Sequence, residues 1–229
     1  MVAKTSLRKE DKMKSLQRMG GAAALYLAAS YVVGLVLFIA VLDYPNIVDP
    51  VQKVGVVVQK QAVIYALYLI TYVIFGCFLI VLALALYDRL KSGAPATMQV
   101  ATAIGIIWAG SLIGSGMISN AGIAPVAALY AKDPAQAAVT WQAFETVASG
   151  LGNGNGEILG GLMTLLVSWA ALRAGGLPKI LNYLGVVVGL VGVVSTLPPL
   201  NALVGIFGMS QIIWFVWLGI VLLRPASVG

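Results

Sequence analysis

The sequence predicts an all-α integral membrane protein, a bundle of six transmembrane helices with the N- and C-termini in the cytoplasm. Of its 229 residues, 60% are hydrophobic and only 10% are charged, and the mean hydropathy is +0.97. A soluble domain usually carries about 25% charged residues, so this chain could not cover a globular surface with polar groups. The apolar residues also stand in long blocks, and about 20 such residues cross a bilayer as a helix. A soluble enzyme is therefore excluded.

Residues 1–18 form a basic cytoplasmic segment, and residues 19–225 form a single six-helix transmembrane domain. The first apolar run is too long for the core of a signal peptide and lacks a convincing cleavage site, so we interpret it as a spanning helix. The basic segment could continue this helix along the membrane surface, where its lysines would meet anionic lipid. The six spans are predicted near residues 19–42, 61–87, 98–119, 157–173, 180–197 and 203–223.

The longest predicted connection, residues 120–156, contains one helical pattern. Ala137, Trp141, Phe144 and Ala148 recur at helical spacing. This pattern suits a short helix that lies at the membrane interface.

The basic residues divide unequally between the two sides of this predicted topology. Eleven of the 14 Lys and Arg residues fall on the side of the termini, and three fall on the other side. Since cytoplasmic loops carry the excess of Lys and Arg, this division places segments 43–60 and 120–150 outside a plasma (inner) membrane. The net charge of +6 thus reflects membrane orientation, and we expect no nucleic-acid partner.

Two features of the composition limit the chemistry. The chain has no histidine, which removes the usual axial ligand of haem and the commonest ligand of zinc and copper. Its one cysteine, Cys77, lies in an apolar run and cannot form an intramolecular disulfide. We expect no cofactor, no metal site and no catalytic residues.

Glycines four residues apart occur in several spans. Such spacing lets helix backbones approach closely in lipid, where no hydrophobic force drives helices together. We expect close packing within the bundle at these positions rather than a dedicated dimer motif. The pairs are Gly110 with Gly114, Gly156 with Gly160, and Gly185 with Gly189.

The few polar side chains of the spans are predicted to lie at similar depths. Glu157 precedes Arg173 by 16 residues, which is about 24 Å of helix. Tyr72 and Gln211 reach comparable heights, measured from the cytoplasmic ends of their own spans. We therefore predict a ligand-binding pocket that is open to the outer leaflet. Its predicted lining residues are Glu157, Asn153, Asn155, Tyr72 and Gln211.

The glycine-rich segment at residues 149–157 has two interpretations. It could be a surface loop in which Asn155 caps the following helix and Glu157 interacts with the helix dipole. It could instead continue the fourth helix, which would place Glu157 inside the bundle as a functional acid. The sequence leaves both open.

Several helix-boundary motifs resemble those of a family of uncharacterised six-helix bacterial membrane proteins, known only as a domain of unknown function. The similarity covers residues 13–225, although the Gly-Asn repeat at 152–156 departs from the family pattern. The resemblance implies architecture only. The motifs are MGGAAALYL at 19–27, LYDRLK at 86–91, LPKILNYLG at 177–185 and WLGI at 217–220.

Three classes of function remain after these exclusions. Sparse polar residues and a small soluble portion favour a non-catalytic membrane module that binds lipids, a small ligand or partner subunits, as an accessory subunit or a homo-oligomer. The alternative is a transporter or channel for a small or hydrophobic solute. A membrane enzyme using Glu157 or Asp43 is the least favoured, because no partner base or nucleophile accompanies them.

Overall fold

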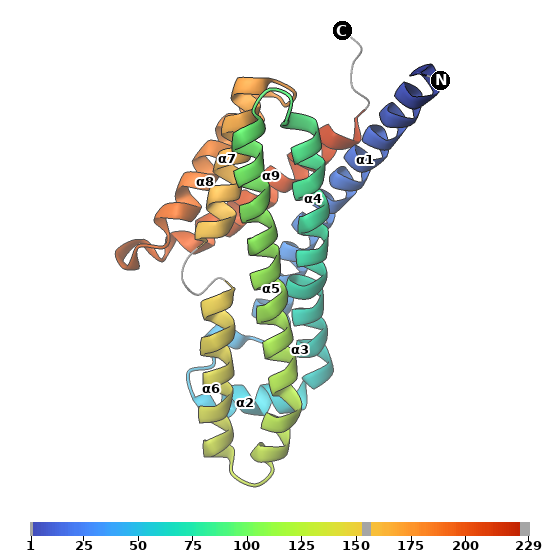
Figure 1. The fold of residues 1–229 in the computed structure, drawn as a ribbon. Helices are drawn as coiled ribbons and strands as arrows, with labels where there is room; N and C mark the ends of the chain where they lie inside the picture. The colour runs from blue at the N-terminus through green and yellow to red at the C-terminus, as the bar shows by residue number, and fades with distance from the viewer. Residues whose placement is uncertain (1, 153–156, 225–229) are drawn as a thin grey trace. The chain divides into compact units, whose positions relative to one another are not determined.

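The computed structural model describes residues 2–152 and 157–224, with side chains from Ser15 onward, and every regular element in these residues is a helix (Figure 1). The chain divides into two compact units, which we describe separately. Unit 1 consists of Met1–Ala29, Phe78–Trp108 and Gly156–Gly229. Unit 2 consists of Ser30–Cys77 and Ala109–Asn155.

Helices occupy all six positions at which the sequence predicts a span. The predicted basic segment is itself helical and continuous with the first span. In chain order the α-helices are α1 (Val2–Leu35), α2 (Pro50–Gln59), α3 (Gln61–Tyr68), α4 (Phe75–Leu90), α5 (Pro95–Tyr130), α6 (Pro134–Leu151), α7 (Ile158–Ala174), α8 (Lys179–Val194) and α9 (Leu203–Leu223). Short helical segments are η1 (Val36–Val41), η2 (Tyr44–Asn46), η3 (Leu69–Ile74) and η4 (Pro198–Leu200).

Four helical stretches in the described residues are long and apolar enough to cross a membrane. They are Ser15–Val41, Gln61–Leu90, Pro95–Tyr130 and Leu203–Leu223. The remaining two apolar helices, α7 and α8, have 17 and 16 residues and fall short of that length. The chain therefore has the character of a membrane protein.

Helix α5 is longer than the sequence predicts. We expected the third span to end near Ser119, but the helix runs through Pro125 to Tyr130 and has 36 residues. Proline has no backbone N–H to donate inside a helix and usually ends it. Here the flanking side chains of Ile123 and Val126 are buried in the core of unit 2, so tertiary packing compensates for the lost hydrogen bond.

Both predicted external connections contain helices. Segment 43–60 holds α2, and segment 120–156 holds the end of α5 together with α6. Asp49 caps α2 by accepting a hydrogen bond from the Val51 amide, and Asp133 caps α6 in the same way from the Gln136 amide. In each helix a proline follows the cap, where its missing N–H costs nothing.

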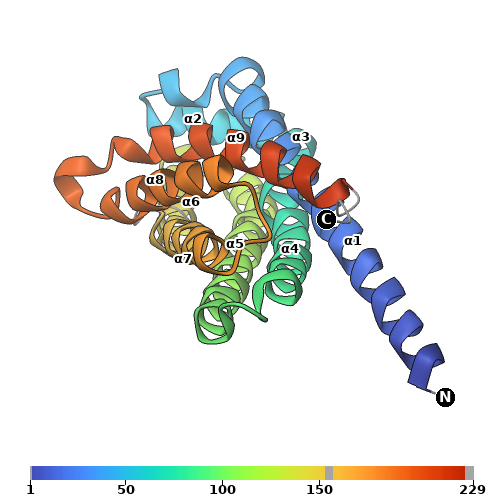
Figure 2. The same cartoon turned by 90° about the horizontal axis from the view of Figure 1, so that it is seen from above.

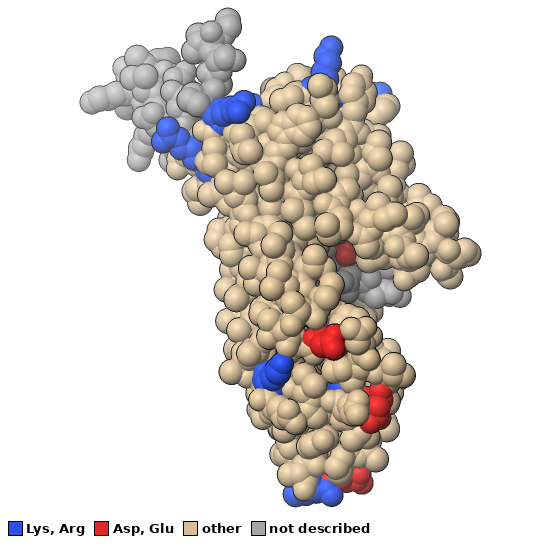
Figure 3. All heavy atoms as spheres, turned by 180° about the vertical axis from the view of Figure 1, so that it is seen from behind, with Lys and Arg blue, Asp and Glu red and all other residues tan. Residues whose placement is uncertain are grey.

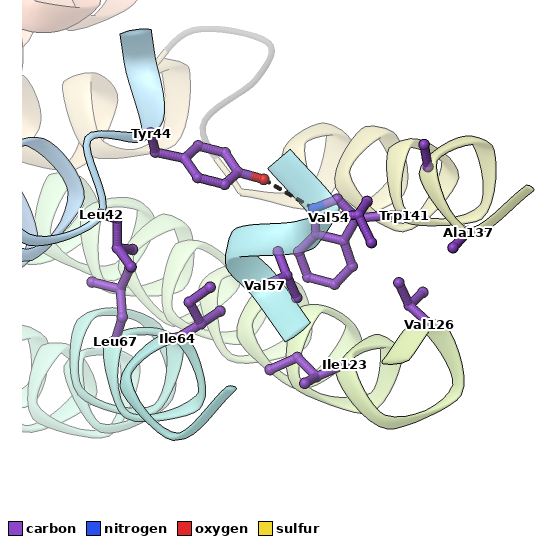
Figure 4. Close-up of a cluster of buried hydrophobic side chains, with 11 residues drawn as sticks. Leu42, Tyr44, Val54, Val57, Ile64, Leu67, Ile123, Val126, Ala137 and Trp141 are labelled. Carbon is purple, nitrogen blue, oxygen red and sulfur yellow. Dashed lines mark hydrogen bonds between the residues drawn. The ribbon is translucent and has the colours of Figure 1, made fainter. Parts of the chain in front are cut away.

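Helices α2 and α6 pack on each other in unit 2 (Figure 4). The helical spacing noted in the sequence is confirmed, since Ala137, Trp141 and Ala148 are buried on one face of α6. Val54 and Val57 of α2 are buried in the same hydrophobic cluster.

Unit 1 is built on close contact between α7 and α8 (Figure 2). A Cβ added to Gly161 would lie 2.6 Å from the backbone nitrogen of Val193. A Cβ added to Gly189 would lie 2.6 Å from the backbone nitrogen of Leu165. These backbones approach so closely that only glycine fits at either position.

The glycine prediction is right for α8 and wrong for α5. Gly185 and Gly189 lie at tight helix contacts as expected. A Cβ on Gly110, however, would meet no atom within 4 Å, and one on Gly114 would meet only the Leu151 side chain at 3.8 Å. Glycine spacing identifies a helix face with small side chains, but it does not reveal whether a neighbouring helix covers that face.

Candidate functional site

Glu157 stands immediately before the first turn of α7. Its side chain is buried, with 8% exposure. Its backbone amide donates a hydrogen bond of 3.2 Å to Oγ of Ser195, at the end of α8. The Ser195 hydroxyl in turn donates to the backbone oxygen of Gly192 at 2.7 Å. Glu157 is thus fixed through its backbone, and its carboxylate is held away from the surface.

Gln211 is fully buried on α9 and is bonded to Thr164 of α7. Its Nε2 donates to Oγ1 of Thr164 at 3.1 Å, and the Thr164 hydroxyl lies 3.4 Å from Oε1 of Gln211. The two side chains thus satisfy each other's hydrogen-bonding groups in the interior of unit 1, between α7 and α9. Gln211 and Glu157 belong to the same unit, but each is bonded to a different partner.

Tyr72 lies in η3, a π-helical segment of unit 2. Its ring is 5.6 Å from the ring of Tyr68, and its Cβ faces Gly116 of α5. Glu157 and Gln211 belong to unit 1 instead. Asn153 and Asn155 lie outside the described residues, so the predicted outer-leaflet pocket stays a prediction.

Unit 2 contains a hydrogen-bonded cluster that the sequence did not predict, and Figure 4 shows one of its bonds, between Tyr44 and Trp141. The Tyr44 hydroxyl donates to Oε1 of Glu145 at 2.5 Å. Nε1 of Trp141 donates to the same hydroxyl at 2.9 Å. We call these three residues the Tyr44 cluster. The cluster joins η2 to α6. Trp141 and Glu145 lie 97 and 101 positions after Tyr44 in the chain.

An aromatic ring and a cation both lie close to the Tyr44 ring. The ring of Phe38 lies 5.2 Å from the Tyr44 ring, and Nζ of Lys53 lies 5.0 Å above it. Burial, followed by the nearby Glu145 carboxylate, raises the pKa of Tyr44 above its ordinary value. The phenol therefore remains protonated and acts as a hydrogen-bond donor to Glu145.

Further hydroxyl contacts join the helices around this cluster. Ser119 of α5 is hydrogen-bonded to Tyr68, which is also close enough to Glu145 to interact with it electrostatically. The Ser115 hydroxyl donates to the backbone oxygen of Ala148 at 2.8 Å. Polar side chains thus connect α3, α5 and α6 in the interior of unit 2.

A signal for two of the three residues of the Tyr44 cluster was present in the sequence. Trp141 and Glu145 are four residues apart in the predicted short helix, which places them on one face. Tyr44 is remote in sequence and lies in a segment that looked like a polar connection. Only the tertiary fold brings it to this face.

On the basic side of unit 1, the turn between α4 and α5 contacts the turn between α7 and α8. Nε and Nη2 of Arg89 donate to the backbone oxygen of Gly176 at 2.9 and 2.7 Å. A Cβ on Gly93 would overlap the Cβ of Ala174. The guanidinium of Arg173 lies 4.9 Å from the exposed ring of Trp169.

Within residues 2–152 and 157–224, no three His, Cys, Asp or Glu side chains are grouped so that they could hold a metal ion. Cys77 is exposed on the surface of the structure. The acids in close contact with other side chains, such as Glu145 and Asp88, are paired with single partners.

Comparison with known proteins assigns the chain to a family. No curated protein and no solved structure shows significant similarity to the chain. A family model matches residues 19–224, which is nearly the whole described region. The chain belongs to this family, described as a domain of unknown function (DUF4386).

Proposed function

We propose that the protein is a non-catalytic multi-pass module of the plasma (inner) membrane, with six spans and with both termini in the cytoplasm. In this proposal it binds membrane lipids and serves as an accessory part of a larger assembly. The observation that carries the proposal is the structural use of charged side chains. Arg89 binds a turn carbonyl, and Lys60 donates to the backbone oxygen of Val41 at 2.6 Å. Glu145 accepts from a buried phenol.

The alternation of six spans is supported by contacts inside each unit. The turns at Arg89 and Gly176, both predicted to be cytoplasmic, touch each other in unit 1. Nε2 of Gln17, near the start of the first span, donates to the backbone oxygen of Leu222 at 3.1 Å near the end of the last. Segments 43–60 and 120–150, both predicted to be external, pack together in unit 2.

Lipid contact is supported by aromatic and basic side chains at the ends of α7 and α8. Trp169 and Tyr183 are exposed, and Arg173 lies over the Trp169 ring. Aromatic and basic residues are typical of the boundary between hydrocarbon and headgroups. On the face drawn in Figure 3, residues other than Lys, Arg, Asp and Glu form most of the surface. Such a surface suits a lipid environment.

The test is purification in a mild detergent, followed by native mass spectrometry of everything that co-elutes. A stoichiometric protein partner or retained phospholipid supports the accessory module. The double substitution Arg173→Gln and Lys179→Gln should lower the retention of anionic phospholipid, whereas the control Lys132→Gln, on the predicted external side, should not. A chain that elutes alone and free of lipid contradicts the proposal.

A transporter is the second candidate, and two π-helical segments favour it. Segments η1 and η3 interrupt the first two spans, and π-helical turns are frequent at functional sites. The Ser30 hydroxyl donates to the Ile70 backbone oxygen in η3 at 3.1 Å. A monomer that carries one defined small molecule in the same mass spectra would favour this candidate.

A further inference from the structure

Glu157 is a buried acid in the apolar interior of unit 1. Aromatic side chains enclose the first turn of the helix that it begins. A Cβ on Gly160 would lie 2.8 Å from the Trp108 ring and 3.1 Å from the Phe207 ring. An ionised carboxylate in such surroundings is costly unless an opposite charge compensates it.

No described basic side chain of unit 1 is placed to supply that charge. Arg173 ends the same helix, 16 residues or about 24 Å away, and lies over Trp169. Arg89 is bonded to the backbone of Gly176, and Lys91 is paired with Asp88. These cations gather at the opposite end of α7, so among the described residues of unit 1 it is the positive N-terminal end of the α7 dipole that offsets the charge of Glu157, and only in part.

Two hydroxyl-bearing residues, Ser195 and Thr196, follow α8 near this end of α7. Oγ of Ser195 lies 3.2 Å from the Glu157 amide nitrogen, and Ser195 is fully buried. Oγ1 of Thr196, the next residue, is buried and has no hydrogen-bond partner among the described residues. Both residues follow the C-terminus of α8, where the helix dipole is negative. A carboxylate, two hydroxyl oxygens and a helix C-terminus favour a cation.

We infer that Glu157, Ser195 and Thr196 form a binding site for a small monovalent metal cation of the sodium type. The carboxylate supplies the charge, and the hydroxyl oxygens supply neutral ligands. Carboxylate, hydroxyl and carbonyl oxygens are the ligands that hard cations prefer. A bound proton would neutralise the acid as well, but it would leave the Thr196 hydroxyl unused. This site is independent of the function proposed above.

The test is the thermal stability of the purified full-length protein in detergent, at one pH and one ionic strength. The chloride salts of sodium, potassium and the bulky cation N-methyl-D-glucamine are compared. An ion that binds only the folded state stabilises it by mass action. We expect sodium to raise the Tm of the unaltered protein saturably, by about 5 °C relative to N-methyl-D-glucamine.

Matched variants assign this effect to the site. Glu157→Gln should abolish the dependence on sodium, whatever its own Tm. Glu145→Gln in unit 2 is the control, and its Tm should still rise with sodium. Ser195→Ala should raise the sodium concentration at half-effect about tenfold, because one ligand oxygen is lost. This variant also keeps the test open if Glu157→Gln does not fold.

Direct binding of radioactive sodium gives an independent measurement, with one exchangeable ion per chain expected. Equal Tm values in all three salts, or a sodium effect that survives in Glu157→Gln, would overturn the inference. A Tm that responds to acidification but not to sodium would overturn it too, since Glu157 would then carry a proton.

Discussion

The α7–α8 pair and the α2–α6 pair are both helix–helix contacts, but different residues make them. Between α7 and α8, Gly161 and Gly189 bring backbone atoms together. Between α2 and α6, large side chains such as Trp141 fill the space, and the Tyr44 cluster bonds the neighbouring η2 to α6. Close backbone packing suits lipid, where apolar side chains gain little from leaving their surroundings. Burial of large apolar side chains stabilises a contact more where water surrounds the helices, because the side chains then leave water.

The comparison predicts that added volume is most damaging between α7 and α8. Gly189→Leu should lower the free energy of unfolding by about 3 kcal/mol, because the new side chain would overlap the backbone of Leu165. Thermal unfolding in detergent measures the effect. An unchanged Tm would show that this contact contributes nothing to unit 1.

In the α2–α6 pair, loss of a polar group should be more damaging than added volume. Tyr44→Phe leaves the buried indole N–H of Trp141 and the half-buried carboxylate of Glu145 without their partner, at a cost of about 1–3 kcal/mol. Glu145→Gln should cost less, since an amide oxygen still accepts the hydrogen bond.

A double-mutant cycle on Tyr44→Phe and Glu145→Gln sharpens this prediction. The two effects should fall short of additivity, because each variant weakens the same bond. Strict additivity would mean that the two residues act independently in the fold.

The contact between the two basic-side turns of unit 1 should give a smaller effect. Arg89→Lys keeps the positive charge but loses one of the two hydrogen bonds to the Gly176 carbonyl. We expect a loss of about 1 kcal/mol in unfolding free energy. A larger loss for Asp88→Asn would indicate that the neighbouring ion pair, rather than Arg89, holds these turns.

Gly110→Leu should have the smallest effect, within about 0.5 kcal/mol, because an added Cβ meets no neighbour there. It has the same spacing motif as Gly185 and Gly189 and therefore serves as the control for the glycine series. A loss comparable with that of Gly189→Leu would mean that a partner covers Gly110 in the membrane.

The apolar runs allowed the positions of the six hydrophobic helices to be predicted, because hydropathy acts locally along the chain. The extension of α5 through Pro125 could not be predicted, since it depends on the burial of Ile123 and Val126 by distant helices. The same limit applies to the Tyr44 cluster. Helical spacing places Trp141 beside Glu145, but nothing local brings Tyr44 to them.

The predicted pocket illustrates a different limit. Depth along a helix can be counted from sequence, and Glu157 and Gln211 are both buried in the structure. The direction of each side chain depends on helix rotation, which counting does not provide. Gln211 turns toward Thr164 and not toward Glu157.

The central claim is that six spans cross the membrane in alternating directions. Cysteine labelling tests this claim most directly. Single cysteines are introduced at Ser92, Lys179, Gln52 and Ala135, all exposed, in a Cys77→Ala background. Intact cells or sealed vesicles are then treated with a membrane-impermeant thiol reagent. We predict that Gln52→Cys and Ala135→Cys are labelled from outside, while Ser92→Cys and Lys179→Cys are labelled only after the membrane is opened. Labelling of Ser92→Cys and Ala135→Cys from the same side would contradict the account.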